Sequence, residues 1–413
     1  MYILPGYTKY YEKDGSLYIF SQLLQNEVKL TTEELKNEFY KLVETGGVSK
    51  LSTELTVFLH DQELLLNEKE IQESLTKAKQ LLGNGLLLTI LPTEGCNFRC
   101  PYCYETHTPT IMSEEILSKI HQYIREQVPK FKTVRISWFG GEPTLCKDIV
   151  LQTSSLVQSL QKEYHFIYGA DMVTNGYLLD VDSFKEYYKG GITHYQITLD
   201  GWNHDKTRPH VTGKATLEKI ISNLKSISML SEEYKFSVIL RHNILAEDRD
   251  YSWYDYLYKL FGNDKRFSVA VALVSDWGGE TVKSLELAEK EQREVLRSDH
   301  EKYLDKIGMK REGKKIEPFC NICYASCPSG FVFRPNGKIE KCTVALNHPK
   351  NQVGYVDPDK GIIIDESKAY RWCHSELKKE CYICPEVLSC LNISCRKKII
   401  VDDYDEKKCL CGK

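Results

Sequence analysis

Three cysteines with the spacing CxxxCxxC, at Cys96, Cys100 and Cys103, are the residues of this chain that most directly suggest chemistry. They come directly after an apolar segment, residues 86–91, that has the composition of a strand. Three thiolates can hold three irons of a 4Fe-4S cube, so that the fourth iron can bind an exogenous molecule. A closed zinc site would need a fourth ligand nearby, but the next cysteine, Cys146, lies far along the chain. The spacing therefore favours an open iron-sulfur cluster over a zinc site or a chance grouping.

The elements that must position this cluster are short β-type runs that alternate with helical stretches. Such alternation predicts repeated βαβ units in an α/β fold. The carboxyl ends of parallel strands meet at one edge, where barrels and doubly wound sheets both bind ligands. Motifs that follow these runs are therefore expected to converge. The runs are residues 86–91, 134–138, 166–173, 194–199, 236–240 and 268–274.

Glycine-rich and polar motifs follow the second, third and fourth of these runs. They are Phe139-Gly-Gly-Glu-Pro143, Thr174-Asn-Gly176 and Thr198-Leu-Asp-Gly201, the last followed by His204, Asp205 and Arg208. Glycine lets the backbone come close to a ligand, and the Glu142 carboxylate can accept a charge-assisted hydrogen bond from an ammonium group. Taken singly, each motif is also ordinary turn and cap chemistry.

Together with the cysteine motif, these segments resemble the radical S-adenosylmethionine (SAM) superfamily. The resemblance implies a partial (β/α)6 TIM barrel over residues 86–285, in which the open iron binds the amino and carboxylate groups of SAM. It implies that Cys96, Cys100 and Cys103 are the catalytic cluster ligands. It also implies that Tyr102 packs on adenine, and that Thr198 and Arg208 hold the carboxylate and ribose. The implied cofactor-binding residues are Tyr102, Gly140, Gly141, Glu142, Pro143, Thr174, Asn175, Thr198, Asp200 and Arg208.

The C-terminal region, residues 320–413, contains eleven of the fifteen cysteines. In a chain without a secretory start, such density favours metal ligands over disulfides. The spacings resemble the SPASM domain, a cysteine-rich iron-sulfur domain of many peptide-modifying radical enzymes, although Cys395 lies one residue too far from Cys390. The resemblance implies two auxiliary 4Fe-4S clusters, hence three clusters in all; one or two structural zinc ions are the alternative. The implied ligands are Cys327, Cys342, Cys395 and one of Cys320 or Cys323 for the first cluster, and Cys381, Cys384, Cys390 and one of Cys409 or Cys411 for the second.

The N-terminal region, residues 1–85, reads as three short strands followed by three helices, which predicts a small winged-helix-like α+β domain. It contains nine Lys or Arg and thirteen Asp or Glu, a balance that opposes contact with nucleic-acid phosphates. The arrangement resembles the RiPP recognition element of peptide maturases, in which a leader peptide adds to a sheet edge. A plain stabilising domain is the alternative. Residues 286–319 are expected to be a helical bridge between barrel and tail.

Composition excludes several classes of protein. The chain is 42% hydrophobic and 27% charged, which is ordinary for a globular protein, and its net charge is only −3. No apolar run approaches the roughly 18 residues of a membrane span. The N-terminus has neither the basic start nor the apolar stretch of a signal peptide. We therefore expect a cytoplasmic protein without nucleic-acid or membrane partners.

The resemblance implies a radical SAM oxidoreductase that acts on a peptide. Reductive cleavage of SAM would give methionine and a 5′-deoxyadenosyl radical, which would take a hydrogen atom from a ribosomally made precursor peptide with a leader. We expect a thioether crosslink, with a carbon-carbon crosslink as the alternative, and an electron donor such as flavodoxin or ferredoxin. A formylglycine-generating sulfatase-type maturase would carry Asp where this chain has Thr343. A non-enzymatic iron-sulfur electron carrier is a further alternative, but it would not explain the glycine-rich loop.

Overall fold

The computed structural model describes residues 1–279, 281–312, 322–392 and 395–404. Its contacts divide the chain into two compact units. The larger unit comprises residues 85–313 and 329–366, and the smaller comprises residues 1–84, 314–328 and 367–413. The smaller unit thus combines the N-terminal region with part of the cysteine-rich C-terminal region.

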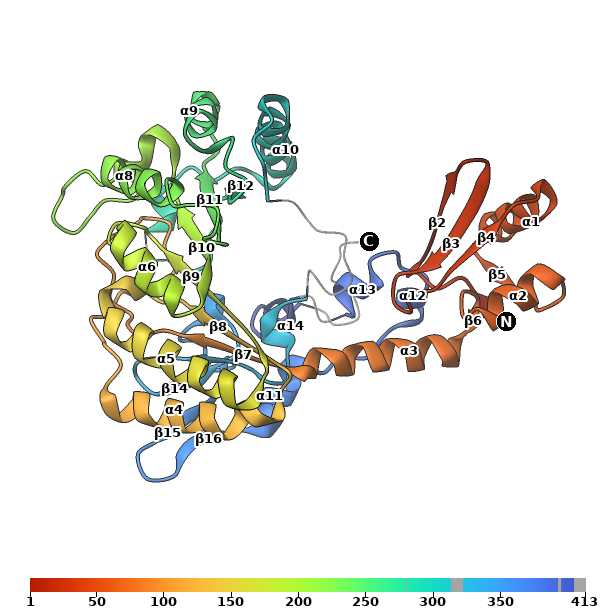
Figure 1. Ribbon diagram of the computed structural model, residues 1–413, viewed down its shortest axis with the longest axis horizontal. Helices are drawn as coiled ribbons and strands as arrows, with labels where there is room; N and C mark the ends of the chain where they lie inside the picture. Colours follow the sequence, from red (N-terminus) through yellow and green to blue (C-terminus); the bar gives the residue numbers. More distant parts are fainter. Residues whose placement is uncertain (280, 313–321, 393–394, 405–413) are drawn as a thin grey trace. The chain divides into compact units, whose positions relative to one another are not determined.

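The larger unit is built on a ten-stranded sheet in which six parallel strands lie in chain order (Figure 1). Each strand of this series pairs in parallel with the next. The α/β alternation predicted from the sequence is therefore confirmed. The strand bounds agree with prediction to within about two residues, except that β11 continues past residue 240 to Ile244. The strands are β7 (Gly85–Ile90), β8 (Thr133–Trp138), β9 (Ile167–Thr174), β10 (Ile192–Thr198), β11 (Ser237–Ile244) and β12 (Phe267–Leu273).

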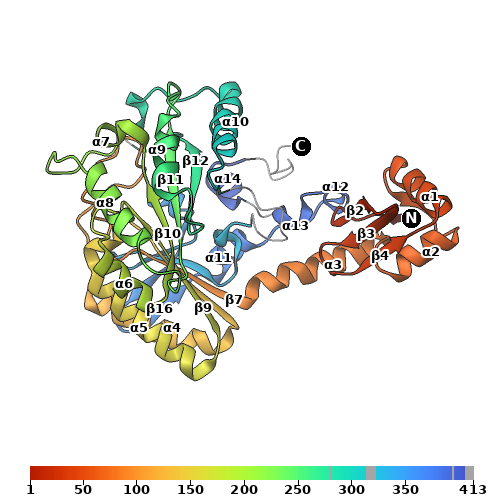
Figure 2. The same ribbon diagram turned by 45° about the horizontal axis from the view of Figure 1, so that its top comes forward.

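Helices between these strands cover one face of the sheet. Figures 1 and 2 show α4, α5, α6 and α8 side by side along that face. In α4 the residues Leu117, Ile120 and Ile124 recur at helical spacing and are buried, and Ser113 caps the first turn. Alternate residues of β11 are buried, so its other residues point to the opposite, inner face. The helices are α4 (Glu114–Gln127), α5 (Lys147–Tyr164), α6 (Val181–Lys189), α7 (His204–Thr207), α8 (Leu217–Ser228), α9 (Ser252–Phe261) and α10 (Lys290–Ile307).

The sheet continues beyond β7 with four strands from the cysteine-rich region, a feature that the sequence did not predict. The first of them, β13, pairs in parallel with β7, and the others follow as antiparallel neighbours. This extension brings Cys342, which follows the second added strand, into the larger unit. The added strands are β13 (Gly330–Phe333), β14 (Lys338–Glu340), β15 (Gln352–Asp357) and β16 (Gly361–Ile364).

The smaller unit contains two small antiparallel sheets, in the orders β2-β3-β4 and β5-β1-β6, and several helices. The predicted α+β character of the N-terminal region is confirmed. Asp14 and Gly15 make the β2–β3 turn with positive φ values of 50° and 69°, and Thr32 caps α1. An apolar cluster joins N-terminal Tyr7 and Leu75 to C-terminal Leu391. The elements are β1 (Tyr2–Ile3), β2 (Thr8–Lys13), β3 (Ser16–Ser21), β4 (Glu27–Leu30), α1 (Glu33–Glu44), β5 (Val48–Ser49), α2 (Glu54–Asp61), β6 (Leu66–Asn67), α3 (Glu68–Leu81), α11 (Glu366–Cys373, which begins in the larger unit), α12 (Lys379–Tyr382), α13 (Val387–Cys390) and α14 (Arg396–Ile400).

Among the helices of the described ranges, none combines the length and the apolar character that a membrane span requires.

Candidate functional site

The loops that follow the parallel strands surround a cavity of about 380 Å³. A volume of this size is typical of small-molecule sites. The convergence follows from the parallel topology, which brings the carboxyl ends of the strands to one edge. Pro143 and Asp200 are buried and do not line the cavity wall. The predicted site residues that line it are Cys96, Cys100, Tyr102, Cys103, Gly140, Gly141, Glu142, Thr174, Asn175, Thr198 and Arg208.

The cysteine loop is held by backbone hydrogen bonds to the segment that follows α7. Arg99 N donates to Pro209 O at 2.8 Å, and Val211 N donates to Asn97 O at 2.9 Å. Between these bonds the Phe98 side chain is only 1% exposed, so it anchors the loop against the barrel. The Cys96 thiol sulfur accepts a hydrogen bond from Phe98 N at 3.3 Å.

The three thiols suit an iron-sulfur cluster. All three line one cavity, and soft thiolate ligands select iron-sulfur clusters. In the described part of the chain no group of three His, Cys, Asp or Glu side chains is arranged to hold a single metal ion. A 4Fe-4S cube instead places each thiolate on a different iron, which needs a wider spacing. Burial raises the pKa of the Cys96 and Cys103 thiols to about 12, so iron must displace their protons as it binds.

Two glycines let the loop after β8 pack tightly against the start of the cysteine loop. A Cβ on Gly140 would stand 2.5 Å from Thr93 O, and one on Gly141 would stand 2.3 Å from Gly95 O. Gly140 also has a φ of +107°, which side chains rarely adopt. Glu142 N donates to Gly95 O at 3.0 Å, which fixes the packing. The glycines thus make room for backbone of the same chain, a need that the sequence did not reveal, and their contact with a ligand stays a prediction.

Glu142 ties the loop after β8 to the end of β9. Its Oε1 accepts hydrogen bonds from Thr144 Oγ1 and Thr174 Oγ1, both at 2.6 Å. Its Oε2 accepts from Asn175 N at 2.7 Å, and the side chain is 1% exposed. Burial raises the pKa of Glu142, and these hydrogen bonds oppose that rise. Because Oε2 accepts this one bond, it retains the capacity for one further donor at the cavity wall.

Tyr102 is fixed by a buried polar cluster. Its hydroxyl donates to Asp200 Oδ2 and accepts from Arg208 Nη1 at 2.8 Å. Asp200 also accepts from Thr207 Oγ1 at 3.0 Å and from Asn243 N at 3.3 Å. Burial raises the pKa of Asp200, and the Arg208 guanidinium opposes the rise. The cluster therefore holds Tyr102 in place at the cavity wall.

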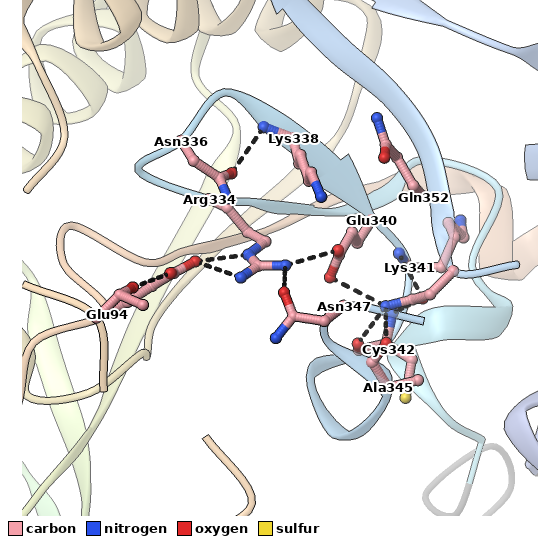
Figure 3. Close-up of polar contacts among 12 residues, drawn as sticks. Glu94, Arg334, Asn336, Lys338, Glu340, Lys341, Cys342, Ala345, Asn347 and Gln352 are labelled. Carbon is pink, nitrogen blue, oxygen red and sulfur yellow. Dashed lines mark hydrogen bonds and ion pairs between the residues drawn. The ribbon is translucent and has the colours of Figure 1, made fainter. Parts of the chain in front are cut away.

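A second buried network, which sequence analysis missed, links the cysteine loop to the added strands (Figure 3). Arg334 follows β13 and donates to Glu94 Oε1 through Nε at 2.7 Å. Its Nη1 donates to Glu340 Oε1 at 3.0 Å and to Asn347 Oδ1 at 2.8 Å. The Arg334 side chain is 2% exposed, and those of Glu94 and Glu340 are 7% and 1% exposed. Since Glu94 lies two residues before Cys96, the network fixes the start of the cysteine loop.

The predicted auxiliary-cluster cysteines fall into three groups. Cys320, Cys409 and Cys411 lie outside the described residues. Cys342 is 5% exposed in the larger unit, where its backbone N donates to Asn351 Oδ1 at 2.9 Å. The remaining cysteines belong to the smaller unit, and their ligand assignments stay predictions. These are Cys323, Cys327, Cys381, Cys384, Cys390 and Cys395.

Residues 90–242 match the family model of the Radical SAM superfamily. This segment is a radical SAM domain. Curated relatives include the GTP 3′,8-cyclase of Campylobacter jejuni subsp. doylei, 28% identical over 164 residues that cover 38% of this chain and 48% of the relative. The GTP 3′,8-cyclase of Clostridium perfringens strain SM101 is 29% identical over 157 residues, or 37% of this chain and 46% of the relative. The chain thus spans about half the length of these relatives, along the radical SAM domain.

Solved structures share the fold over more of the chain. The structure of anSMEcpe with bound AdoMet and Cp18Cys peptide gives a TM-score of 0.53 at 17% identity, and covers 79% of this chain and 92% of that one. Streptococcus suis SuiB bound to precursor peptide SuiA gives 0.52 at 14% identity, and covers 94% of both chains. At these identities the likeness concerns the fold alone. It confirms the predicted partial barrel, with further regions before and after it in the sequence.

The inner face of the radical SAM barrel contributes polar residues that sequence analysis did not assign. Gln196, Arg241 and Asn243 line the cavity from β10 and β11. Glu105 and His107, which follow the cysteine motif, also line it. The available signal for the β11 pair was the polar run Arg241-His-Asn243 at the end of the strand, in which His242 is buried on the opposite face.

We expect Gly141→Ala to disturb the cysteine loop of the radical SAM domain. The added Cβ would clash with Gly95 O, and such overpacking costs about 1–3 kcal/mol. Iron content after anaerobic reconstitution should fall, together with the thermal unfolding midpoint. The control is Gly169→Ala on β9, where an added Cβ has nothing within 4 Å. Equal iron contents in the two variants would contradict the tight packing of these loops.

Proposed function

We propose that this chain is a radical SAM peptide maturase that takes a hydrogen atom from a ribosomally made precursor peptide and installs a crosslink. The observation that carries the proposal is the convergence of Cys96, Cys100 and Cys103 on one cavity with the glycine-rich loop and the polar end of β10. When bound, a 4Fe-4S cluster and SAM supply reductive cleavage of SAM and the hydrogen-atom abstraction that follows.

The residues of this chain would bind and orient these groups. The three cysteines would hold the cluster through their sulfur atoms. Tyr102, fixed through its hydroxyl, would offer its ring to the adenine, and Thr198 and Arg208 would contact the carboxylate and ribose. The anchored cysteine loop would exclude water from the cavity, which protects a reactive species from side reactions.

A peptide substrate is supported by the smaller unit. In the sheet β2-β3-β4, strand β2 is an edge that pairs with β3 and with no other strand in the described ranges. Its residues Tyr10 and Tyr11 are 45% and 42% exposed. Such an edge can accept an extended peptide as a further strand, with main-chain hydrogen bonds giving affinity. We propose that it binds the leader of the precursor peptide, as a RiPP recognition element would. The binding of the precursor peptide SuiA by SuiB, which shares the fold, is in keeping with this.

The C-terminal cysteines would hold two auxiliary clusters, as their resemblance to the SPASM domain implies. Held by these cysteines, such clusters would supply an acceptor for the second electron of crosslink formation, or a site for a substrate thiolate. A donor such as flavodoxin or ferredoxin would supply the first electron. We propose a thioether as the bond formed, with a carbon-carbon crosslink as the alternative.

Formylglycine formation is the second candidate, and the structure of the added strands disfavours it. Thr343, which stands where such maturases carry a base-like Asp, is 7% exposed beside Cys342. A threonine hydroxyl does not act as a base near neutral pH. The neighbouring Val344 lines the cavity with an apolar side chain.

We expect the chain, when co-expressed anaerobically with a small peptide encoded beside its gene, to remove one pair of hydrogens from that peptide. Mass spectrometry of fragments would locate the crosslink. An aldehyde-reactive hydrazide would separate formylglycine, which it labels, from a crosslink, which it does not label. A peptide without its leader is the control and should remain largely unmodified. An unchanged full-length peptide, in cells whose enzyme still cleaves SAM, would count against a peptide maturase.

A further inference from the structure

Arg241 lies on the inner face of β11, in register with Thr198, one of the predicted SAM-binding residues. Parallel registers place Arg241 between Thr198 on β10 and Ala270 on β12. One step further along, Asn243 lies beside Ala272. Both neighbours on β12 are alanines, so their small side chains leave space next to Arg241 and Asn243. Both polar residues line the cavity of about 380 Å³.

The Arg241 guanidinium is oriented by one hydrogen bond within the chain. Its Nε donates to Asn243 Oδ1 at 2.8 Å. Among the described residues, no other hydrogen bond or ion pair engages its Nη1 or Nη2. These two nitrogens form the edge of the guanidinium that binds a carboxylate in bidentate fashion.

Three other arginines of the larger unit illustrate the contrast, because each has an anionic or hydroxyl partner. Arg334 is paired with Glu94 and Glu340, and Arg135 is paired with Asp171 at 2.7 Å. Arg208 donates to the Tyr102 hydroxyl. Arg241 differs from these three arginines in combining two features. It lines the cavity, and no anionic or hydroxyl group of the described residues is paired with its guanidinium.

None of the carboxylates that line or back this cavity, Glu105, Glu142 and Asp200, has a hydrogen bond or ion pair with Arg241 among the described residues. Glu142 accepts four hydrogen bonds, and Asp200 accepts from Tyr102, Thr207 and Asn243 N. A partly desolvated guanidinium is stabilised by an anion that reaches it from outside. Gln196 lies on the adjacent strand two positions before Thr198, the register partner of Arg241, and adds an amide donor to the same wall.

We propose that Arg241, oriented by Asn243 and accompanied by Gln196, is a specificity-determining residue that binds a carboxylate of the peptide substrate. The carboxylate is an acidic side chain or the C-terminal group near the reacting carbon. This inference rests on the proposed function and deepens it, because it states the chemistry of the residue delivered to the cavity. SAM also carries a carboxylate, so the test must separate the two sources.

The first arm uses probes that need no knowledge of the natural peptide. N-acetyl-L-glutamate α-amide and its neutral counterpart, N-acetyl-L-glutamine α-amide, are added to the SAM-loaded holoenzyme, and binding is followed by saturation-transfer NMR. The acid should bind and the neutral amide should not. Arg241→Gln should weaken binding of the acid by about tenfold to a hundredfold, the range for a charge-assisted hydrogen bond. Arg241→Lys should retain part of the affinity.

The second arm measures the affinity of the holoenzyme for SAM by calorimetry. Arg241→Gln should leave this affinity nearly unchanged. Arg135→Gln is the matched control, because Arg135 lies on the inner face of the same sheet but is paired with Asp171 and outside the cavity lining. It should alter neither SAM nor acid binding.

Two outcomes would overturn the inference. Equal binding of acid and amide to the wild-type protein would remove the carboxylate site. A loss of SAM affinity in Arg241→Gln, together with competition between SAM and the acid, would assign Arg241 to SAM instead. Failure of the proposed function is distinguishable from both: the probes would then bind as expected while no peptide encoded nearby is modified.

Discussion

Cys100→Ala will abolish reductive cleavage of SAM by this protein. Cys100 is the middle member of the three thiols that line the cavity, and its removal would leave two sulfur ligands for the proposed cluster, which would take three from the protein. Two thiolates would not retain the cube during purification. We therefore expect the variant to contain roughly four fewer irons per chain than the wild-type protein. Iron analysis and chromatography of 5′-deoxyadenosine after anaerobic reduction would measure both effects.

Cys146→Ala is the matched control for this experiment. Cys146 is also close to the glycine-rich loop, since it ends the short helical turn Pro143–Cys146, and it is 8% exposed. It does not line the cavity and was not predicted to be a ligand. Its replacement should cost at most about 1–2 kcal/mol of stability and leave the iron content intact. SAM cleavage by Cys100→Ala, or equal loss of iron in both variants, would contradict the assignment of the open cluster.

The barrel could be predicted from the sequence because each of its strands and helices is indicated by a pattern of neighbouring residues. Runs such as residues 134–138 have β-branched or aromatic composition, and helical stretches with caps such as Ser113 separate them. The antiparallel extension β13–β16 was not predicted. Strand β13 has only four residues, all buried, so it shows no alternation. Its partner β7 lies more than two hundred residues away in the sequence, and short-range patterns do not report such pairing.

The convergence of Cys96, Cys100 and Cys103 on one cavity was predictable, because the three lie close together in one loop after a strand. The reason for the glycines was not, because the packing of Gly141 against Gly95 O depends on how two loops meet in space. Arg334 was missed for a similar reason. In a sequence, a lone arginine after a short strand is indistinguishable from a solvated surface charge, and its partner Glu94 is 240 residues away.

Arg334→Met should destabilise the larger unit strongly. The change leaves two carboxylates, Glu94 and Glu340, without their cation in a region where side chains are 7% exposed or less. Breaking a buried ion pair from one side costs about 3–5 kcal/mol. Burial already raises the pKa of Glu340, and Arg334 opposes that rise, so removing Arg334 should raise the pKa further. Thermal unfolding of the reconstituted protein would measure the loss as a lower midpoint.

The comparison that tests this reasoning is Arg135→Met. Arg135 and Asp171 are 2.7 Å apart, the same distance as Arg334 Nε and Glu94 Oε1, but the Arg135 side chain is 61% exposed. An exposed pair contributes about 0–1 kcal/mol, so this variant should unfold close to the wild-type temperature. If burial is the cause, adding Glu340→Gln to Arg334→Met should restore part of the lost stability, because one uncompensated charge is removed. Similar midpoints for Arg334→Met and Arg135→Met would mean that the network in Figure 3 does not support the cysteine loop energetically. A large loss in Arg334→Met with partial recovery in the double variant would establish that the added strands stabilise the barrel through this network.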